Sequence, residues 1–240
     1  MKAAVLKANG RLEGNTVGNP LCPEGGLLVK TQACSICTTD AKMYRCRQRD
    51  LTYPRILGHE FSGIIAESRA GNDGFKEGDR VQVAPGINCG TCSACRKGND
   101  NRCSNIGIFG FNHDGGFAGY VTIPKTSVQN GGVNRIPDNT PFENDALSEP
   151  LASCINAQEQ VGVSPGDSVL ILGAGPTGLL HAGLARTRGA GRIMVAERLE
   201  NRLETARLSS AAAPTASPSP ATNESSRRPC CQRNSACARE

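Results

Sequence analysis

The segment from Ser168 to Glu197 restricts the possible folds more than any other part of the chain. It reads SVLILGAGPTGLLHAGLARTRGAGRIMVAE, an apolar strand, a glycine-rich turn, an apolar helix and a second strand. This order predicts a βαβ unit with strands at 169–172 and 193–196. The turn fits the pattern G-x-G-x-x-G, in which the first glycine makes the turn, the second lets the backbone approach a pyrophosphate, and the third allows close helix packing. Alone, such a pattern can also be an ordinary glycine-rich turn, but its place between a strand and a helix favours a dinucleotide site.

An acidic residue at the end of the second strand supports this interpretation. Glu197 follows Gly178 by 19 residues. An acid at this place accepts hydrogen bonds from the ribose hydroxyls and repels a 2′-phosphate, which favours NAD over NADP. Arg198 beside it makes that preference moderate, because an arginine can accommodate the phosphate. The predicted cofactor-binding residues are Gly173, Gly175, Pro176, Thr177, Gly178, Glu197 and Arg202.

Four clustered cysteines predict a metal site. INCGTCSACRKGNDNRCSN spaces its cysteines by three, three and eight residues, and the polar residues between them cannot form a core. A closed set of four thiolates is how structural zinc is held, although an iron–sulfur cluster suits the same ligands and four unrelated reduced thiols are the simplest alternative. The chain has 12 cysteines and no secretory signal, which points to metal or redox chemistry rather than disulfides. The predicted structural ligands are Cys89, Cys92, Cys95 and Cys103.

A second group of potential ligands has a different composition. Cys37 lies in SICTTD, and the pair His59-Glu60 lies in LGHEFSG. One cysteine, one histidine and one carboxylate form the ligand mix of a catalytic zinc, which keeps a position open for water or substrate. Glu149, in LSEP, is a further candidate from a distant part of the chain.

The pattern of apolar and turn-forming residues changes twice along the chain. Residues 1–145 read as short strands broken by glycine and proline, which suggests an all-β, barrel-like domain. Residues 146–208 alternate helix and strand, ending in the helical pattern ENRLETARL. Residues 209–240 contain no Val, Ile, Leu, Met, Phe, Tyr or Trp, so we expect this segment to be disordered because it cannot repay the entropy of ordering.

Taken together, six motifs resemble the zinc-containing medium-chain alcohol dehydrogenase family. They are SICTTD, LGHEFSG, EGDRV, the four-cysteine lobe, SEPLASC and GAGPTG, and they run in unbroken order to about residue 208. The branch of polyol (sorbitol-like) and threonine dehydrogenases is the most similar. The resemblance implies a GroES-like β-barrel domain, 1–145, with a structural zinc lobe at 89–103, followed by a Rossmann domain with its NAD site. It also implies an active-site zinc in the cleft between the two domains.

The resemblance also implies a role for each matched residue. Cys37 and His59 match zinc ligands, Glu60 matches a carboxylate that is a ligand or an exchanging partner, and Glu149 matches the last protein ligand. Thr39 matches the residue that passes the alcohol proton, and Asp40 the carboxylate that orients the zinc-bound imidazole. The implied reaction is hydride transfer from a secondary alcohol or polyol to NAD, with zinc as Lewis acid.

The nucleotide-binding domain is expected to be partial. A Rossmann domain has about six parallel strands, whereas residues 146–208 supply two, and residues 209–240 offer no apolar side chains for the others. We therefore expect exposed apolar surface, an impaired homo-oligomer, and bound zinc with little or no turnover. A frameshift, a gene-model error or a truncated pseudogene product is favoured over a natural tail. The alternative function is a non-catalytic, zinc-binding GroES-like remnant.

Other classes of partner are not favoured. The net charge of +5 includes no basic block interleaved with aromatic residues, so nucleic-acid binding is not expected. No apolar run reaches 18 residues, so no membrane span is expected. The first residues lack the apolar core of a signal peptide, and the expected location is the cytoplasm.

Overall fold

The chain forms two compact units in a computed structural model that describes residues 1–71 and 74–209. The first unit is Met1–Glu149, and the described part of the second begins at Pro150. The predicted tail lies outside the described residues, apart from Ser209.

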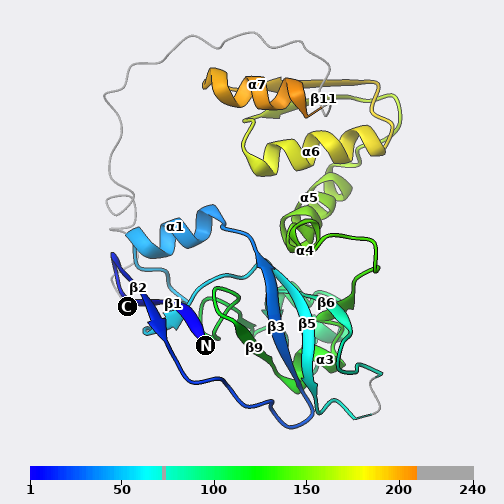
Figure 1. Cartoon of the computed structure of the whole chain (residues 1–240). Helices are drawn as coiled ribbons and strands as arrows, with labels where there is room; N and C mark the ends of the chain where they lie inside the picture. The colour runs from blue at the N-terminus through cyan, green and yellow to red at the C-terminus, as the bar shows by residue number, and fades with distance from the viewer. Residues whose placement is uncertain (72–73, 210–240) are drawn as a thin grey trace, which may run out of the picture. The chain divides into compact units, whose positions relative to one another are not determined.

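The first unit is built on a five-stranded antiparallel sheet in the order β10-β6-β5-β3-β9 (Figure 1). Strand β3 begins by alternating between buried apolar and more exposed residues, as a half-buried strand requires, whereas the central strand β5 begins with three buried residues. Leu27, Val29, Phe61 and Ile65 are each at most 1% exposed and form the centre of the core. The strands are β3 Leu27–Cys34, β5 Phe61–Ser68, β6 Arg80–Val83, β9 Tyr120–Ile123 and β10 Val133–Arg135.

Smaller elements complete this unit. A three-stranded sheet has the order β2-β1-β4, and a two-stranded sheet pairs β7 with β8. The remaining strands are β1 Lys2–Ala8, β2 Arg11–Thr16, β4 Arg55–Ile56, β7 Gly86–Ile87 and β8 Gly107–Ile108. The helices are α1 Thr38–Arg45, α2 Ser93–Arg96, the 3₁₀ turn η1 Asp100–Arg102, α3 Lys125–Gln129 and α4 Phe142–Ala146.

The first unit is therefore not all-β as predicted, because it also contains the helices α1 to α4 and the turn η1, and α1 is the longest of them. Two interactions explain why TTDAKMYR is helical. The Asp40 carboxylate accepts the Cys37 N–H at 2.9 Å, which satisfies one of the free donors at the start of the helix. Met43 is fully buried and anchors one face of the helix.

The second unit contains the predicted βαβ arrangement. Strand β11, Ser168–Leu172, pairs in parallel with β12, Arg192–Ala196, and α6, Pro176–Thr187, connects them. Helix α5, Ser148–Val161, precedes this arrangement, and α7, Glu200–Leu208, follows it (Figure 1). Alanines of α6 and α7 pack with Ile171 and Val195 in one core cluster.

The opposite face of this two-stranded sheet is largely open. Leu170 is 59% exposed and Leu172 is 81% exposed. Alternation along β11 directs both side chains away from the face that carries Ile171. The expectation of exposed apolar surface is thus confirmed. Within the described residues, no helix is both long enough and apolar enough to cross a membrane.

Candidate metal centres and dinucleotide site

The four predicted structural ligands come together in one loop. Cys89, Cys92, Cys95 and Cys103 place their sulfur atoms within 4.8 Å of one another. The backbone of the loop points amide groups at the sulfurs: the Cys89 Sγ accepts from Cys92 N at 3.4 Å, and the Cys92 Sγ accepts from Cys95 N at 3.5 Å. These bonds follow from the short spacing, because each C-x₂-C step brings the amide of the second cysteine next to the sulfur of the first.

The sulfur spacing fits a tetrahedral zinc ion. Zinc–sulfur bonds of about 2.3 Å place two sulfurs of a tetrahedron about 3.8 Å apart. The Cys89–Cys95 and Cys92–Cys95 separations are 4.0 and 3.5 Å, and all four cysteines are free thiols. The donor set and its geometry therefore fit a closed, structural zinc site.

The thiols of this loop and the buried Cys34 differ in their expected reactivity. Donation from the backbone of Cys95 lowers the pKa of Cys92 to about 5, and donation from Thr91 lowers the pKa of Cys89 to about 7. Burial, with the charge of Asp40, raises the pKa of Cys34 to about 12. Because the thiolate is the nucleophile, iodoacetamide at pH 7 should alkylate Cys92 and Cys89 in the zinc-free protein, whether or not the loop keeps its order, and leave Cys34 unmodified. Peptide mapping by mass spectrometry measures this order. Labelling of Cys34 as fast as Cys92, or no protection by added zinc, would contradict it.

The second centre gathers three side chains from two segments that meet beside the large sheet. Cys37 follows β3, and His59 and Glu60 immediately precede β5. Their potential ligand atoms lie within 4.8 Å of one another, and the His59 Nε2 is 3.9 Å from Glu60 Oε1. His59 and Glu60 are 6% and 4% exposed, so their polar atoms need a partner that water does not provide.

Asp40 connects the parts of this centre. Its Oδ2 accepts the Cys37 N–H, while its Oδ1 lies 3.4 Å from the Gly58 N and 3.5 Å from the His59 Nδ1. The last contact is long, and the Nδ1 has no well-aligned acceptor, so we describe it as an electrostatic contact rather than a formed hydrogen bond. Asp40 therefore fixes the loop of one candidate ligand and faces the ring of another.

Gly58 allows this close approach. Its φ is +93°, a conformation that side chains with a Cβ rarely adopt, and a Cβ there would lie 2.8 Å from the Cys34 Sγ. The glycine before His59 is therefore required by both backbone conformation and packing.

The pKa values of His59, Glu149 and Cys37 are each shifted by their surroundings at and near this centre. Burial lowers the pKa of His59, but the carboxylates of Asp40, Glu149 and Glu60 outweigh burial, so the pKa is raised. Burial raises the pKa of Glu149, and the charge of Glu60 adds to this effect. Glu149 thus lies within electrostatic reach of the centre, but its oxygens do not belong to the group of converging ligand atoms. Burial also raises the pKa of Cys37, against donation from the amide and hydroxyl of Thr39.

The glycine-rich loop connects β11 to α6. Gly173 has a φ of +110°, and Gly175 is the N-cap of α6, which has Pro176 in its first turn. A Cβ at Gly173 would meet nothing within 4 Å, and one at Gly175 would meet only the Arg202 guanidinium at 3.9 Å. The space over the loop is open, which the approach of a pyrophosphate to the backbone requires.

Glu197 is held in place at the edge of this loop. Its Oε2 accepts the Ala174 N–H at 3.0 Å, and its Oε1 accepts the N–H groups of Arg198 and Leu199. These three donors, led by Ala174, lower the pKa of Glu197. The Arg202 Nη1 lies 3.7 Å from Oε2. A carboxylate has about four acceptor positions, so one remains for a ligand.

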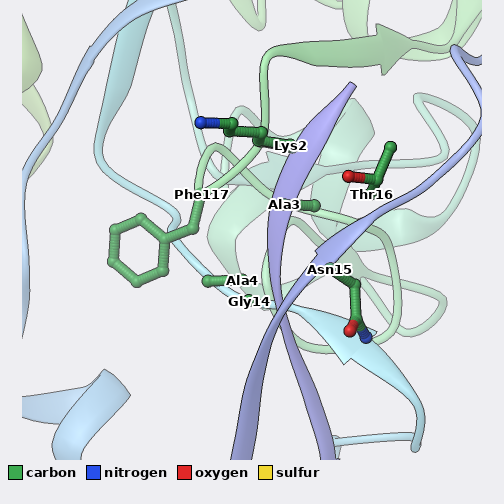
Figure 2. A pocket seen from close by; sticks show the side chains of 8 residues that line it. Lys2, Ala3, Ala4, Gly14, Asn15, Thr16 and Phe117 are labelled. Atoms are coloured by element: carbon green, nitrogen blue, oxygen red, sulfur yellow. The ribbon is translucent and has the colours of Figure 1, made fainter.

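A pocket of about 610 Å³ lies elsewhere, on strands β1 and β2 (Figure 2). Lys2 is its only ionisable side chain, and none of the predicted site residues lines it. It therefore brings together no set of groups for catalysis. Its lining consists of Lys2, Ala3, Ala4, Gly14, Asn15, Thr16, Phe117 and Ala118.

Known proteins resemble the chain in both units. Residues 23–134 match the model of the alcohol dehydrogenase GroES-like domain. The D-altritol 5-dehydrogenase of Agrobacterium fabrum is 36% identical over 75% of this chain and 53% of its own length. The sorbitol dehydrogenase of Bacillus subtilis is 36% identical over 86% of this chain and 58% of its own length. The chain thus spans little more than half the length of these relatives.

A solved structure extends the similarity to three dimensions. A protein of Sinorhizobium meliloti 1021, described as a zinc-binding dehydrogenase and bound to NADP, matches with a TM-score of 0.82 and 34% identity. The match covers 93% of this chain and 63% of that protein. Fold, motif order and sequence agree, and the chain belongs to the zinc-type medium-chain alcohol dehydrogenase family.

Proposed function

We propose that the protein is a zinc-dependent dehydrogenase whose reaction is hydride transfer from a secondary alcohol or polyol to NAD, and we expect little or no turnover from this chain alone. In this proposal the chain supplies both zinc centres and the pyrophosphate-binding βαβ unit. The convergence of Cys37, His59 and Glu60, one thiol, one imidazole and one carboxylate, carries the proposal, because this donor set is typical of a zinc that retains an open position. A zinc ion held there would supply Lewis acidity and would thereby lower the pKa of the substrate hydroxyl. Two polyol dehydrogenases among the relatives support the substrate class.

Residues of the chain itself would orient the metal ligands and transfer the substrate's proton. Asp40 holds the Cys37 loop through one oxygen and faces the His59 ring with the other, so it orients two ligands at once. Thr39 is half-buried beside Cys37. Its hydroxyl can accept the substrate's proton while donating its own onward, which is the role the resemblance implies. Glu149, whose pKa is raised by burial and by the charge of Glu60, is a further candidate ligand, which is the role the resemblance implies.

The cofactor site favours NAD over NADP in this proposal. Glu197 keeps a negative charge at the edge of the glycine loop, where a 2′-phosphate would be repelled. NADH should therefore bind more tightly than NADPH in a fluorescence titration of the purified chain. Glu197→Gln keeps the size of the side chain but removes its charge. It should reduce the ratio of NADH affinity to NADPH affinity about tenfold, the equivalent of roughly 1.4 kcal/mol.

A control separates local charge from total charge. Glu200→Gln removes the same charge from the first turn of α7, where Glu200 pairs with the exposed Arg207. It should leave the NADH-to-NADPH ratio unchanged. Equal binding of the two cofactors by the unmodified chain would contradict the assigned preference.

The second candidate function is a non-catalytic zinc-binding remnant. The exposed Leu170 and Leu172 favour it, because this face of the nucleotide-binding sheet is not covered by the described residues. Metal analysis and cofactor titration of the purified chain decide between the two. Two zinc ions per chain, saturable NADH binding and NADH formation with sorbitol, threonine or butanediol support the dehydrogenase. Two zinc ions without NADH binding support the remnant, and a single zinc ion contradicts the proposed catalytic centre.

A further inference from the structure

We propose that Ser35 is a positioning residue that restricts Glu60 to binding the metal through a single oxygen. This inference rests on the proposed function, because it concerns how the carboxylate of the Cys37–His59–Glu60 centre is presented. Ser35 belongs to none of the ligand groups and was not among the residues predicted from the sequence.

The register of the sheet brings Ser35 and Glu60 together. Cys34 at the end of β3 pairs with Phe61 at the start of β5. The next step along both segments places Ser35 opposite Glu60, and the Ser35 N–H donates to the Glu60 carbonyl at 2.9 Å. Side chains of directly opposed residues lie on the same face of an antiparallel pair. The Ser35 hydroxyl accordingly donates a hydrogen bond to the Glu60 Oε2.

The two oxygens of Glu60 therefore have different surroundings. Oε2 is engaged by the Ser35 hydroxyl, while Oε1 lies 3.9 Å from the His59 Nε2. Zinc bound to an imidazole nitrogen and a carboxylate oxygen at about 2.1 Å places these two atoms about 3.4 Å apart in a tetrahedron. Oε1 is thus the oxygen that can share an ion with His59.

This arrangement has a chemical consequence at the metal. A carboxylate that is free to turn can approach an ion with either oxygen or with both, and the second oxygen would occupy the position that a substrate needs. Glu60 is 4% exposed, so water cannot easily replace the serine as partner of Oε2. The Ser35 hydroxyl thus both orders the ligand and keeps one coordination position available.

The test compares zinc binding by four forms of the full chain. Ser35→Ala removes the hydroxyl and keeps the backbone bond to Glu60, whereas Ser35→Thr restores a hydroxyl. Ser68→Ala is the matched control, because Ser68 lies at the other end of β5 and donates to the Phe75 carbonyl. Competition against a chromogenic chelator gives the affinity of each zinc. The d–d spectrum of cobalt, added to a chain whose four-cysteine site already holds zinc, reports the ligand geometry of the Cys37 centre.

Ser35→Ala should weaken the second zinc about 10- to 100-fold, the usual effect of losing a group that orients a ligand. It should also change the cobalt d–d spectrum and leave the four-cysteine zinc unaffected. Ser35→Thr should restore affinity and spectrum, and Ser68→Ala should behave as the unmodified chain. Unchanged affinity and spectrum in Ser35→Ala, or failure of Ser35→Thr to restore them, overturns the role of Ser35 alone. An unmodified chain that binds zinc only at the four cysteines overturns the proposed catalytic centre as well, so the two failures are distinguishable.

Discussion

Replacing Cys92 and Cys95 together by serine is expected to remove one zinc ion per chain and to unfold the loop from Cys89 to Cys103. The elements inside this loop, α2 and η1, contain no buried residue. The loop therefore has no apolar core of its own, and its order depends on the convergence of the four sulfurs. Structural zinc contributes about 10–16 kcal/mol in small zinc peptides, far more than the roughly 1 kcal/mol of an average substitution.

Two measurements check this expectation. Metal analysis should find one zinc per chain instead of two, and trypsin should cleave rapidly after Arg96, Lys97 or Arg102, which are exposed in the loop. The control is Cys22→Ser, because Cys22 is a buried free thiol that donates to the backbone carbonyls of Gly26 and Glu67 and belongs to neither ligand group of the described residues. A double variant that retains two zinc ions or resists trypsin would refute the structural role of this centre.

The sequence predicts sites built from neighbouring residues more completely than sites built from segments that are far apart in the chain. The four-cysteine site and the glycine loop are local, because their residues lie close together in the chain. Spacing alone therefore predicts the meeting of Cys89, Cys92 and Cys95, and the strand–turn–helix order predicts the loop at Gly173. Helix α1 was missed although it is also local, because its eight residues are too few for a clear periodic pattern and its start depends on the Asp40 carboxylate.

The Cys37 centre depends on contacts between distant segments. Ligand chemistry indicates Cys37, His59 and Glu60, but the partner of Glu60 depends on the register of β3 against β5. Two irregularities interrupt that ladder, one after Leu28 and one after Thr31. A shift of one residue moves a side chain to the other face of a sheet. The pattern of apolar residues alone therefore could not predict that Ser35 lies opposite Glu60. The assignment of Glu149 as a ligand also depends on such a distant contact, and it stays a prediction.

Gly178→Ala is expected to abolish tight NADH binding and to destabilise the second unit. A Cβ at this position would lie 2.0 Å from the Gly173 carbonyl oxygen, a distance that no rotation of a side chain can relieve because the clashing atom belongs to the backbone. Helix α6 must then move away from β11, and the glycine loop moves with it. Overpacking of this kind costs typically about 1–3 kcal/mol, and the loop no longer presents its amides to a pyrophosphate.

The same helix contains the control for this substitution. Gly183 lies five residues further along α6, and a Cβ there would meet nothing within 4 Å. Because alanine is the better helix former by about 1 kcal/mol, Gly183→Ala should stabilise the unit slightly and leave NADH binding unchanged. Both variants add one methyl group to one helix, so a difference between them in fluorescence titration and thermal unfolding isolates the contact of Gly178 with the loop. If Gly178→Ala bound NADH as tightly as Gly183→Ala, the glycine-rich loop could not be a site that depends on the close packing of α6 against β11.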